Sequence, residues 1–348
     1  MTPPTALPDE MPVAVYTAPG QLALEHHPTP RPGPGEVLVE VGHCGVCGTD
    51  LHLVLEGWGR PGTIPGHEAS GTVAAVGDGV TAWSVGDPVV AGPTARCGTC
   101  TACRAGRPSL CAERSTPGRA DPPGAFARFL LLPSDQLLAV PDGLSRRAAA
   151  LTEPLAVALH AITRSAIAPG ASALVSGLGP IGALVLAALR ADDHPVDVVE
   201  PGPARRQLAE RLGARRVLHP DELRTYSIAE PDVIDPEAVD VVFECSGHRT
   251  AMEAGLGRLA RGGTLVLVGN GIDPPRFDPN RILLNELTVT GSFVYDAGGF
   301  EAALALLASG RLPLDELVEP DDVGLEGLLP AMRGLAEGRI ARKVLVAP

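Results

Sequence analysis

Short runs that alternate apolar and polar residues dominate the first part of the chain. Within residues 12–140 these runs are separated by glycine and proline. Alternation with a period of two, bounded by turn residues, is typical of half-buried β-strands. We therefore predict a β-rich first region, with strands at EVLVEV (36–41), GTVAAV (71–76) and DPVVAG (87–92).

The pattern changes further along the chain. Residues 144–168 have helical spacing, and from residue 172 short apolar runs alternate with helical ones. The expected strands are ALVS, PVDVVEP, VDVVFECSG, GGTLVLVGN and, later, LTVTGSFVY (287–295). The expected helices are PIGALVLAALRA, ARRQLAERLGA, AMEAGLGRLA and EAALALLASG, the last ending at Gly310. Strand–helix alternation predicts a parallel doubly wound sheet, so the fold class is α/β with a β-rich domain beside it.

One apolar stretch is nearly long enough to cross a bilayer. Residues 171–189, ASALVSGLGPIGALVLAAL, hold three glycines and a proline within six positions. A strand, a glycine turn and a helix explain this stretch better than a transmembrane helix does. We expect no membrane association.

Composition and charge exclude further partners. The 348 residues are 45% hydrophobic and 20% charged, an ordinary globular balance, and the formal net charge is −13. Adjacent basic residues occur only as pairs, such as Arg205-Arg206 and Arg215-Arg216, which are too small for a nucleic-acid or anionic-membrane face. The N-terminal MTPPTALPDEMP has no export pattern, so we expect a cytoplasmic protein.

Four of the seven cysteines are clustered in CGTCTACRAGRPSLC. Two residues separate each of the first three, and the fourth returns after seven more. Zinc takes a tetrahedron of thiolates about 2.3 Å from the metal, and a closed four-sulfur shell makes a structural site. Two disulfides or an iron–sulfur cluster are the alternatives. The predicted ligands are Cys97, Cys100, Cys103 and Cys111.

A second set of candidate ligands is scattered. GVCGTDLH contains Cys47, Thr49, Asp50 and His52, PGHEASG contains His67 and Glu68, and LTEPLAVALH contains Glu153. One Cys, one His and one carboxylate form a plausible zinc shell with a fourth place open. Singly, each has an ordinary explanation: a histidine after glycine is usually a structural hydrogen bonder, and a glutamate before proline can cap a helix.

The pair Cys44 and Cys47 also forms a C-x-x-C, the spacing of thioredoxin-like redox sites. It precedes Gly-Thr-Asp and does not open a helix after a βαβ strand. We therefore interpret Cys44 as a small buried apolar residue.

A glycine-rich loop lies between a predicted strand and a predicted helix. In G-x-G-x-x-G the first glycine permits the tight turn, the second a close approach to pyrophosphate, and the third helix–strand packing. The helix N-terminus then offers N–H donors to phosphate. The loop residues are Gly177, Leu178, Gly179, Pro180, Ile181 and Gly182.

Glu200 ends the next predicted strand, 23 residues after Gly177. A carboxylate there would bind the adenosine ribose hydroxyls and repel a 2′-phosphate, which favours NAD over NADP. Arg205 and Arg206 follow closely and could hold that phosphate, so NADP stays the alternative.

With these features in order, the chain resembles the zinc-containing medium-chain dehydrogenase/reductase family over essentially its whole length. The matching stretches are GHCGVCGTDLH, PGHEASGTVAAVG, CGTCTACRAGRPSLC, TEPLAVALHA, SGLGPIG, VFECSG, GGTLVLVG and ARKVLVAP. The resemblance implies a GroES-like catalytic domain (1–153 and 295–348) and a Rossmann NAD-binding domain (154–294). It implies two zinc ions per chain, one catalytic and one structural.

The resemblance also implies roles for particular residues. Catalytic zinc would bind Cys47, His67 and Glu153, with Glu68 as an alternate or fourth ligand. Asp50 would orient the His67 ring, Thr49 would take the alcohol proton, and His52 would relay it. The cofactor would contact the glycine loop, Glu200, Arg205, Val268 and, at its pyrophosphate, Arg342.

Glu153-Pro154 stands where liver-type alcohol dehydrogenases of this family carry a second cysteine ligand. This departure points to the polyol, threonine and butanediol dehydrogenase branch, and GSFVYDAGGFEAALALLASGRL looks most like butanediol dehydrogenases. We expect an NAD-linked oxidoreductase of a secondary alcohol, diol or polyol. The resemblance further implies a homodimer or homotetramer, with LTVTGSFVY as a candidate edge strand between subunits.

Several alternatives stay open at this point. An NADP-linked sugar or L-threonine dehydrogenase of the same family is one. A zinc-free quinone or enoyl reductase on the same fold is another, and it would lack both ligand sets. A zinc-binding redox sensor without enzymatic activity is the third.

Overall fold

The computed structural model describes residues 7–92, 96–114, 123–224 and 229–348. The first half of the N-terminal segment in which we expect no export signal, residues 1–6, therefore lies outside the described residues. The contacts divide the chain into two compact units. The first comprises 1–153, 296–310 and 318–348, and the second comprises 154–295 and 311–317.

The first unit is built on antiparallel strands. Its largest sheet has the order β14-β3-β4-β5-β7, with β6 also paired to β3, and β1 and β2 form a separate hairpin. The strands are β1 (Glu10–Ala18), β2 (Gln21–Pro28), β3 (Glu36–Gly45), β4 (Glu68–Val76), β5 (Pro88–Ala91), β6 (Phe129–Pro133), β7 (Leu137–Ala139) and β14 (Leu345–Val346). The helices are α1 (Gly48–Val54), α2 (Thr101–Arg104), α3 (Arg146–Ala149), α9 (Gly299–Ala308) and α11 (Leu328–Ala336), with short 3₁₀ turns η1 (Pro108–Leu110), η2 (Ser134–Gln136) and η4 (Leu325–Gly327).

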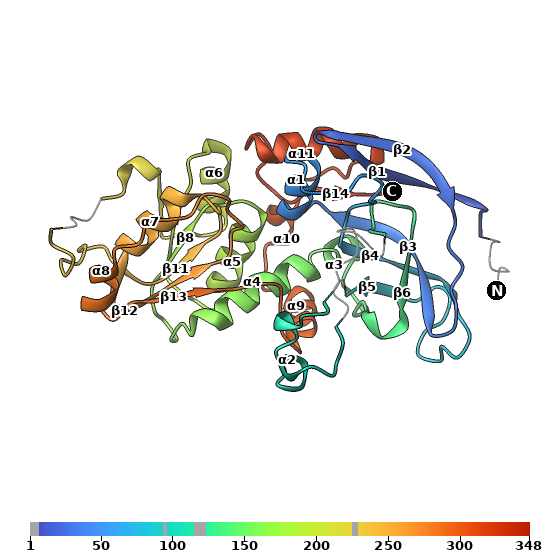
Figure 1. Ribbon diagram of the computed structural model, residues 1–348, viewed down its shortest axis with the longest axis horizontal. Helices are drawn as coiled ribbons and strands as arrows, with labels where there is room; N and C mark the ends of the chain where they lie inside the picture. The colour runs from blue at the N-terminus through green and yellow to red at the C-terminus, as the bar shows by residue number, and fades with distance from the viewer. Residues whose placement is uncertain (1–6, 93–95, 115–122, 225–228) are drawn as a thin grey trace. The chain divides into compact units, whose positions relative to one another are not determined.

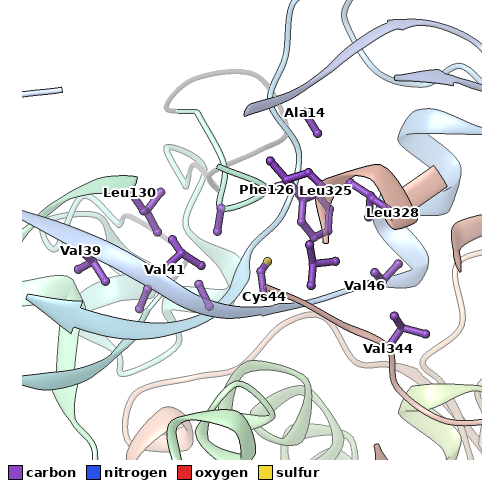
Figure 2. Close-up of a cluster of buried hydrophobic side chains, with 14 of the residues drawn as sticks. Ala14, Val39, Val41, Cys44, Val46, Phe126, Leu130, Leu325, Leu328 and Val344 are labelled. Atoms are coloured by element: carbon purple, nitrogen blue, oxygen red, sulfur yellow. The ribbon is translucent and has the colours of Figure 1, made fainter. Parts of the chain in front are cut away.

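The core of this unit joins segments from both ends of the chain. Figure 2 shows the Phe126 ring beside Leu325, with Leu328 nearby and Val46 below, all in one buried cluster. Cys44 belongs to the same cluster and is fully buried. Burying apolar side chains contributes about 25 cal/mol per Å² of surface removed from water, so this cluster fixes the C-terminal segment against β3.

The second unit contains a six-stranded parallel sheet covered by helices (Figure 1). The strand order β10-β9-β8-β11-β12-β13 is the order of a dinucleotide-binding fold. The strands are β8 (Ala173–Ser176), β9 (Val196–Val199), β10 (Arg216–Leu218), β11 (Val239–Glu244), β12 (Leu259–Leu267) and β13 (Thr288–Gly291). The helices are α5 (Pro180–Ala191), α6 (Pro203–Arg211), α7 (Arg249–Gly257), α8 (Pro279–Leu284) and α10 (Leu314–Leu317), with the 3₁₀ turn η3 (Pro220–Glu222); α4 (Thr152–Ser165) begins at the junction of the two units.

The predicted α/β fold class is confirmed, since a β-rich unit accompanies a doubly wound parallel sheet. The late strand is shorter than expected: β13 covers Thr288–Gly291, and the rest of LTVTGSFVY is not strand. The apolar stretch 171–189 divides into β8, the glycine turn and α5. Among the described residues no helix combines the length and apolarity that a membrane crossing needs.

Candidate active site and metal centres

Three of the scattered ligand candidates converge in the first unit. The ligand atoms of Cys47, His67 and Glu68 all lie within 4.8 Å of one another. Cys47 is the N-cap of α1, Glu68 is the first residue of β4, and His67 immediately precedes that strand. The strand pairing explains the meeting, because Glu68 stands opposite Gly45 on β3, two residues before Cys47.

Glu153 lies outside that compact group but close to it. It is 5% exposed, in the first turn of α4. Burial raises the pKa of Glu153 to about 7, while the charge of His67 opposes the rise and that of Glu68 adds to it. Two of the proposed ligands therefore act directly on its charge.

The open site concentrates acidic groups away from water. Cys47, Asp50, Glu68 and Glu153 can each carry a negative charge, and all but Cys47 are buried. Burial raises the pKa of Asp50 as well. Buried like charges are costly unless a cation compensates them. Thiolate, imidazole and carboxylate are zinc ligands.

His67 adds a second sign that an ion belongs here. Its Nδ1 atom is buried and has no hydrogen-bond partner among the described residues. Burial would lower the pKa of His67, but the charges of Cys47 and Asp50 outweigh it and hold that pKa well above its ordinary value. This environment attracts positive charge to the ring, so the residues present fit a zinc ion.

The two carboxylate oxygens of Asp50 contact different parts of the site. Its Oδ2 accepts the Cys47 N–H at 2.9 Å and so caps α1, and its Oδ1 lies 3.7 Å from His67 Nδ1. The second distance is too long for a hydrogen bond, although it places a carboxylate beside the ring. The predicted orienting role of Asp50 therefore rests on proximity.

Lys343 is a site residue that the sequence analysis missed. Its Nζ lies 2.7 Å from both carboxylate oxygens of Glu68 and 3.0 Å from the Val46 carbonyl oxygen. Both side chains are buried, at 2% and 0% exposure. Lys343 therefore holds the carboxylate that we predict as an alternate zinc ligand.

Space for this ion pair comes from a missing side chain. A Cβ added at Gly45 would lie 2.0 Å from the Glu68 carboxylate oxygen. That distance is far inside van der Waals contact, so glycine at 45 lets the Glu68 carboxylate lie against β3.

The cysteine quartet also comes together. The sulfur atoms of Cys97, Cys100, Cys103 and Cys111 all lie within 4.8 Å of one another, and the Cys111–Cys97 separation is 3.6 Å. All seven cysteines of the chain are free, which contradicts the disulfide alternative. Backbone N–H groups of Cys100 and Thr99 lower the pKa of Cys97 to about 6, while burial and the neighbouring thiols raise the pKa of Cys103 to about 12, so the metal-free cluster readily forms one thiolate.

An ion pair fixes the cysteine lobe (residues 97–111) to a distant segment of the same unit. Asp296 accepts from Arg107 Nε at 2.7 Å and from the Ser109 N–H at 3.1 Å. Asp296 begins the segment in which the chain returns to the first unit. The lobe is therefore held both by its own sulfur cluster and by this contact.

The glycine loop of the second unit has the expected geometry. Gly177 has φ +88°, and a Cβ there would lie 2.7 Å from the Ser246 Cβ. Gly179 is the N-cap of α5 without a side-chain cap, and Pro180 follows at the first turn. Gly182 passes so close to Gly177 that a Cβ would lie 2.0 Å from its carbonyl oxygen. The N–H groups at this helix start suit a phosphate.

Glu200 lies beside this loop with both oxygens bonded to backbone. One accepts the Leu178 N–H at 2.7 Å and the other the Gly202 N–H at 2.8 Å. Arg206 donates to the Glu200 carbonyl oxygen at 3.1 Å and is thereby tied to the backbone. Val268 follows β12 directly, and Arg205 lies on α6. The glycine loop, Glu200 and Val268 thus stand at the carboxyl ends of β8, β9 and β12, where dinucleotides bind in such sheets.

The remaining predicted residues are also placed. The Thr49 N–H donates to Cys47 Sγ at 3.4 Å, and His52 lies on α1 one turn further along. The Arg342 backbone N–H donates to Glu319 at 3.1 Å. A cofactor contact by Arg342 stays a prediction.

Known protein families match both units. The model of the alcohol dehydrogenase GroES-like domain matches residues 33–142, and that of the zinc-binding dehydrogenase domain matches residues 180–309. A 2-dehydro-3-deoxy-L-galactonate 5-dehydrogenase from Pseudoalteromonas atlantica is 36% identical over 82% of this chain and 84% of its own length. A sorbitol dehydrogenase from Bacillus subtilis is 33% identical over 98% of each chain.

A solved structure also matches the chain over nearly its whole length. The crystal structure of 2R,3R-butanediol dehydrogenase from Bacillus subtilis matches with a TM-score of 0.86 and 32% identity. The match covers 97% of this chain and 99% of the other.

Proposed function

The chain belongs to the zinc-dependent alcohol dehydrogenases of the medium-chain dehydrogenase/reductase family, and on that premise we propose that it oxidises a secondary alcohol, diol or polyol with NAD. The reaction is reversible and yields a ketone or aldehyde, NADH and one proton. Similarity to sorbitol and butanediol dehydrogenases supports a substrate with more than one hydroxyl group.

The observation that carries this proposal is the meeting of Cys47, His67 and Glu68 within 4.8 Å, beside buried Glu153. Cys47, His67 and Glu153 would hold catalytic zinc, and Glu68 would be an alternate ligand restrained by Lys343. When bound, the ion supplies a Lewis acid that favours the deprotonated form of a substrate hydroxyl. The cysteine lobe would hold the second, structural zinc.

The chain's own residues would manage the proton. Thr49 follows Cys47 by two positions, and its hydroxyl would take the alcohol proton. His52, one turn along α1, would pass that proton toward water. Asp50 would keep the His67 ring in place through its charge.

The second unit would bind the cofactor, and the first would be the catalytic domain. The glycine loop and the α5 N-terminus suit the pyrophosphate, with Val268, Arg205 and Arg342 as further contacts. Glu200 favours NAD, because a 2′-phosphate would meet its carboxylate. The bound nicotinamide supplies the hydride acceptor.

We also propose a homodimer or homotetramer in the cytoplasm. β13 is at the end of the strand order in its sheet, so its outer edge can pair with a second copy. Seven free cysteines suit a reducing compartment.

The test is a screen of secondary alcohols, diols, sugar alcohols and amino alcohols with NAD and with NADP, joined to elemental analysis of the purified protein. We expect two zinc ions per chain and the highest kcat/KM with NAD and a diol or polyol. A zinc-free preparation that reduces quinones would support the reductase alternative. Zinc-loaded protein that turns over no alcohol would support the sensor and contradict the proposal.

A further inference from the structure

A three-residue arrangement surrounds the imidazole of His52. Its Nδ1 atom lies 2.8 Å from a carboxylate oxygen of Glu56, one helical turn further along the chain. The ring stacks on Trp58, with centroids 4.7 Å apart and planes inclined by 15°. The imidazole therefore has a bonding partner at one nitrogen and a flat surface on one face.

The backbone builds this arrangement after α1 ends. The Trp58 N–H donates to the His52 carbonyl oxygen at 3.2 Å, and the Gly59 N–H donates to the Leu53 carbonyl oxygen at 3.0 Å. These bonds fold residues 57–59 back over the last turn of the helix. The position of Trp58 against His52 thus follows from main-chain hydrogen bonds as well as from ring stacking.

The chemistry of the Glu56 contact decides the state of the ring. A carboxylate only accepts hydrogen bonds, so Nδ1 of His52 must carry the hydrogen in this contact. In the neutral ring Nε2 is then bare and can accept a proton. A carboxylate at Nδ1 also stabilises the imidazolium that forms when Nε2 takes that proton.

We propose that Glu56 is a positioning residue for proton release: it fixes His52 in the Nδ1–H form, so that Nε2 receives the proton that leaves the alcohol. The inference rests on the proposed function and adds to it a residue outside the ligand sets and the Thr49–His52 relay. For each alcohol oxidised, one hydride goes to NAD and one proton passes through Thr49 to Nε2. The resulting imidazolium, paired with Glu56, then loses one proton to water and returns to the neutral ring.

The exposure of the two groups suits this task. The His52 side chain is 22% exposed and that of Glu56 is 41% exposed, so the pair reaches from the partly covered helix toward water. An ion pair this exposed is worth little, so the imidazolium can release its proton to water.

The chain offers a matched control. Glu25 and His27 on β2 also lie 2.8 Å apart, oxygen to ring nitrogen, and both are exposed. This pair lies outside the machinery proposed above. Glu25→Ala therefore removes a histidine–carboxylate contact of the same length without touching His52.

The first experiment measures the tautomer of the His52 ring. Nitrogen-15 histidine NMR of the intact protein, with the His52 signal assigned through His52→Gln, reports which ring nitrogen carries hydrogen. We expect Nδ1–H in the wild type and a shift toward the Nε2–H form in Glu56→Ala. An unchanged tautomer in Glu56→Ala would overturn the proposal, and this readout requires no enzymatic turnover.

The second experiment measures the rate of NADH formation in a single turnover. Glu56→Ala should slow it about fivefold, the size of a half-exposed ion pair, with little change in KM. Added formate should restore part of the loss in Glu56→Ala and leave wild type and Glu25→Ala unchanged, since a purely structural defect would not respond to an external carboxylate. If the wild type is active and Glu56→Ala is equally fast, the role of Glu56 is refuted while the proposed function stands. If the wild type is inactive on every alcohol, the proposed function itself is refuted.

Discussion

The two metal centres of this protein are assembled in opposite ways. The cysteine lobe takes all four sulfur ligands from residues 97–111, and three of the four cysteines are partly exposed. The proposed open site would draw on residues from 47 to 153; its members other than Cys47 are buried, and Lys343 near the C-terminus pairs with Glu68. A local loop can build a closed shell by spacing alone, whereas a reactive site needs a tertiary fold that brings opposing charges together out of water.

The largest effect should come from a ligand of the open site. Cys47→Ser should remove one of two zinc ions per chain and lower kcat about a thousandfold or more, because Lewis-acid stabilisation is worth several kcal/mol. Elemental analysis and alcohol oxidation measure the two losses. Cys44→Ala, in the adjacent core, is the control and should keep both ions. Both zinc ions intact in Cys47→Ser would contradict the ligand assignment.

The second-largest effect should come from the buried ion pair between Lys343 and Glu68. Lys343→Met leaves the Glu68 carboxylate buried without its partner, and breaking such a pair costs about 3–5 kcal/mol of unfolding free energy. Denaturant unfolding measures the loss. Pairing the change with Glu68→Gln should recover part of the stability, because the uncompensated charge is then gone. If the double variant is no more stable than Lys343→Met, the charge pair is not the reason.

The next effect in size should be the pH dependence of zinc binding at the open site. Glu153, with a pKa raised to about 7 by burial, and His67, with a raised pKa, both hold protons in the metal-free site near neutral pH. Zinc must displace these protons, so affinity should fall as pH drops below 7, by about tenfold per pH unit for each proton. Competition with a chromophoric chelator between pH 6 and 8 measures the slope.

Glu153→Gln is the variant that sharpens that measurement. It removes one titrating group, so the slope of affinity against pH should decrease by one proton. If the slope is unchanged, Glu153 is not a ligand of the ion.

The smallest effect should come from the contact that holds the cysteine lobe. Asp296→Ala removes the partner of Arg107 and of the Ser109 N–H, a half-exposed contact worth about 1 kcal/mol. We expect a small fall in melting temperature, full zinc content and unchanged kcat. Loss of the lobe's zinc in this variant would mean that the lobe is not a self-sufficient site.

Much of the chemistry could be predicted from residues close in sequence. The cysteine spacing and the G-x-G-x-x-G between a strand and a helix each define a local geometry. The structure brings the quartet together and turns Gly177 at φ +88° as that geometry requires. Alternating hydrophobic periods likewise predicted the parallel sheet, since period two and period 3.6 are properties of single segments. The strand predicted over 287–295 was too long, because apolar residues continue in the sequence beyond the last paired residues of β12 and β13, Leu267 and Gly291.

One charged partner, Lys343, could not be predicted in this way. Lys343 and Arg342 are neighbours in the sequence, and sequence reasoning selected Arg342. The pairing of β14 with β3, Leu345 opposite Gly45, places Lys343 beside Glu68, while the Arg342 N–H meets Glu319. Glu56 was missed although it lies four residues after His52, a spacing at which side chains on a helical turn can meet.

The sequence by itself determined the α/β architecture, the four-sulfur lobe and the dinucleotide loop, because each is signalled by residue patterns within short segments. Only the tertiary structure decided which cation holds Glu68, because Lys343 lies at the other end of the chain. The physical reason is that hydrogen bonds and ion pairs require partners within about 3 Å. Strand register and turn geometry set such distances between segments that are remote in the chain.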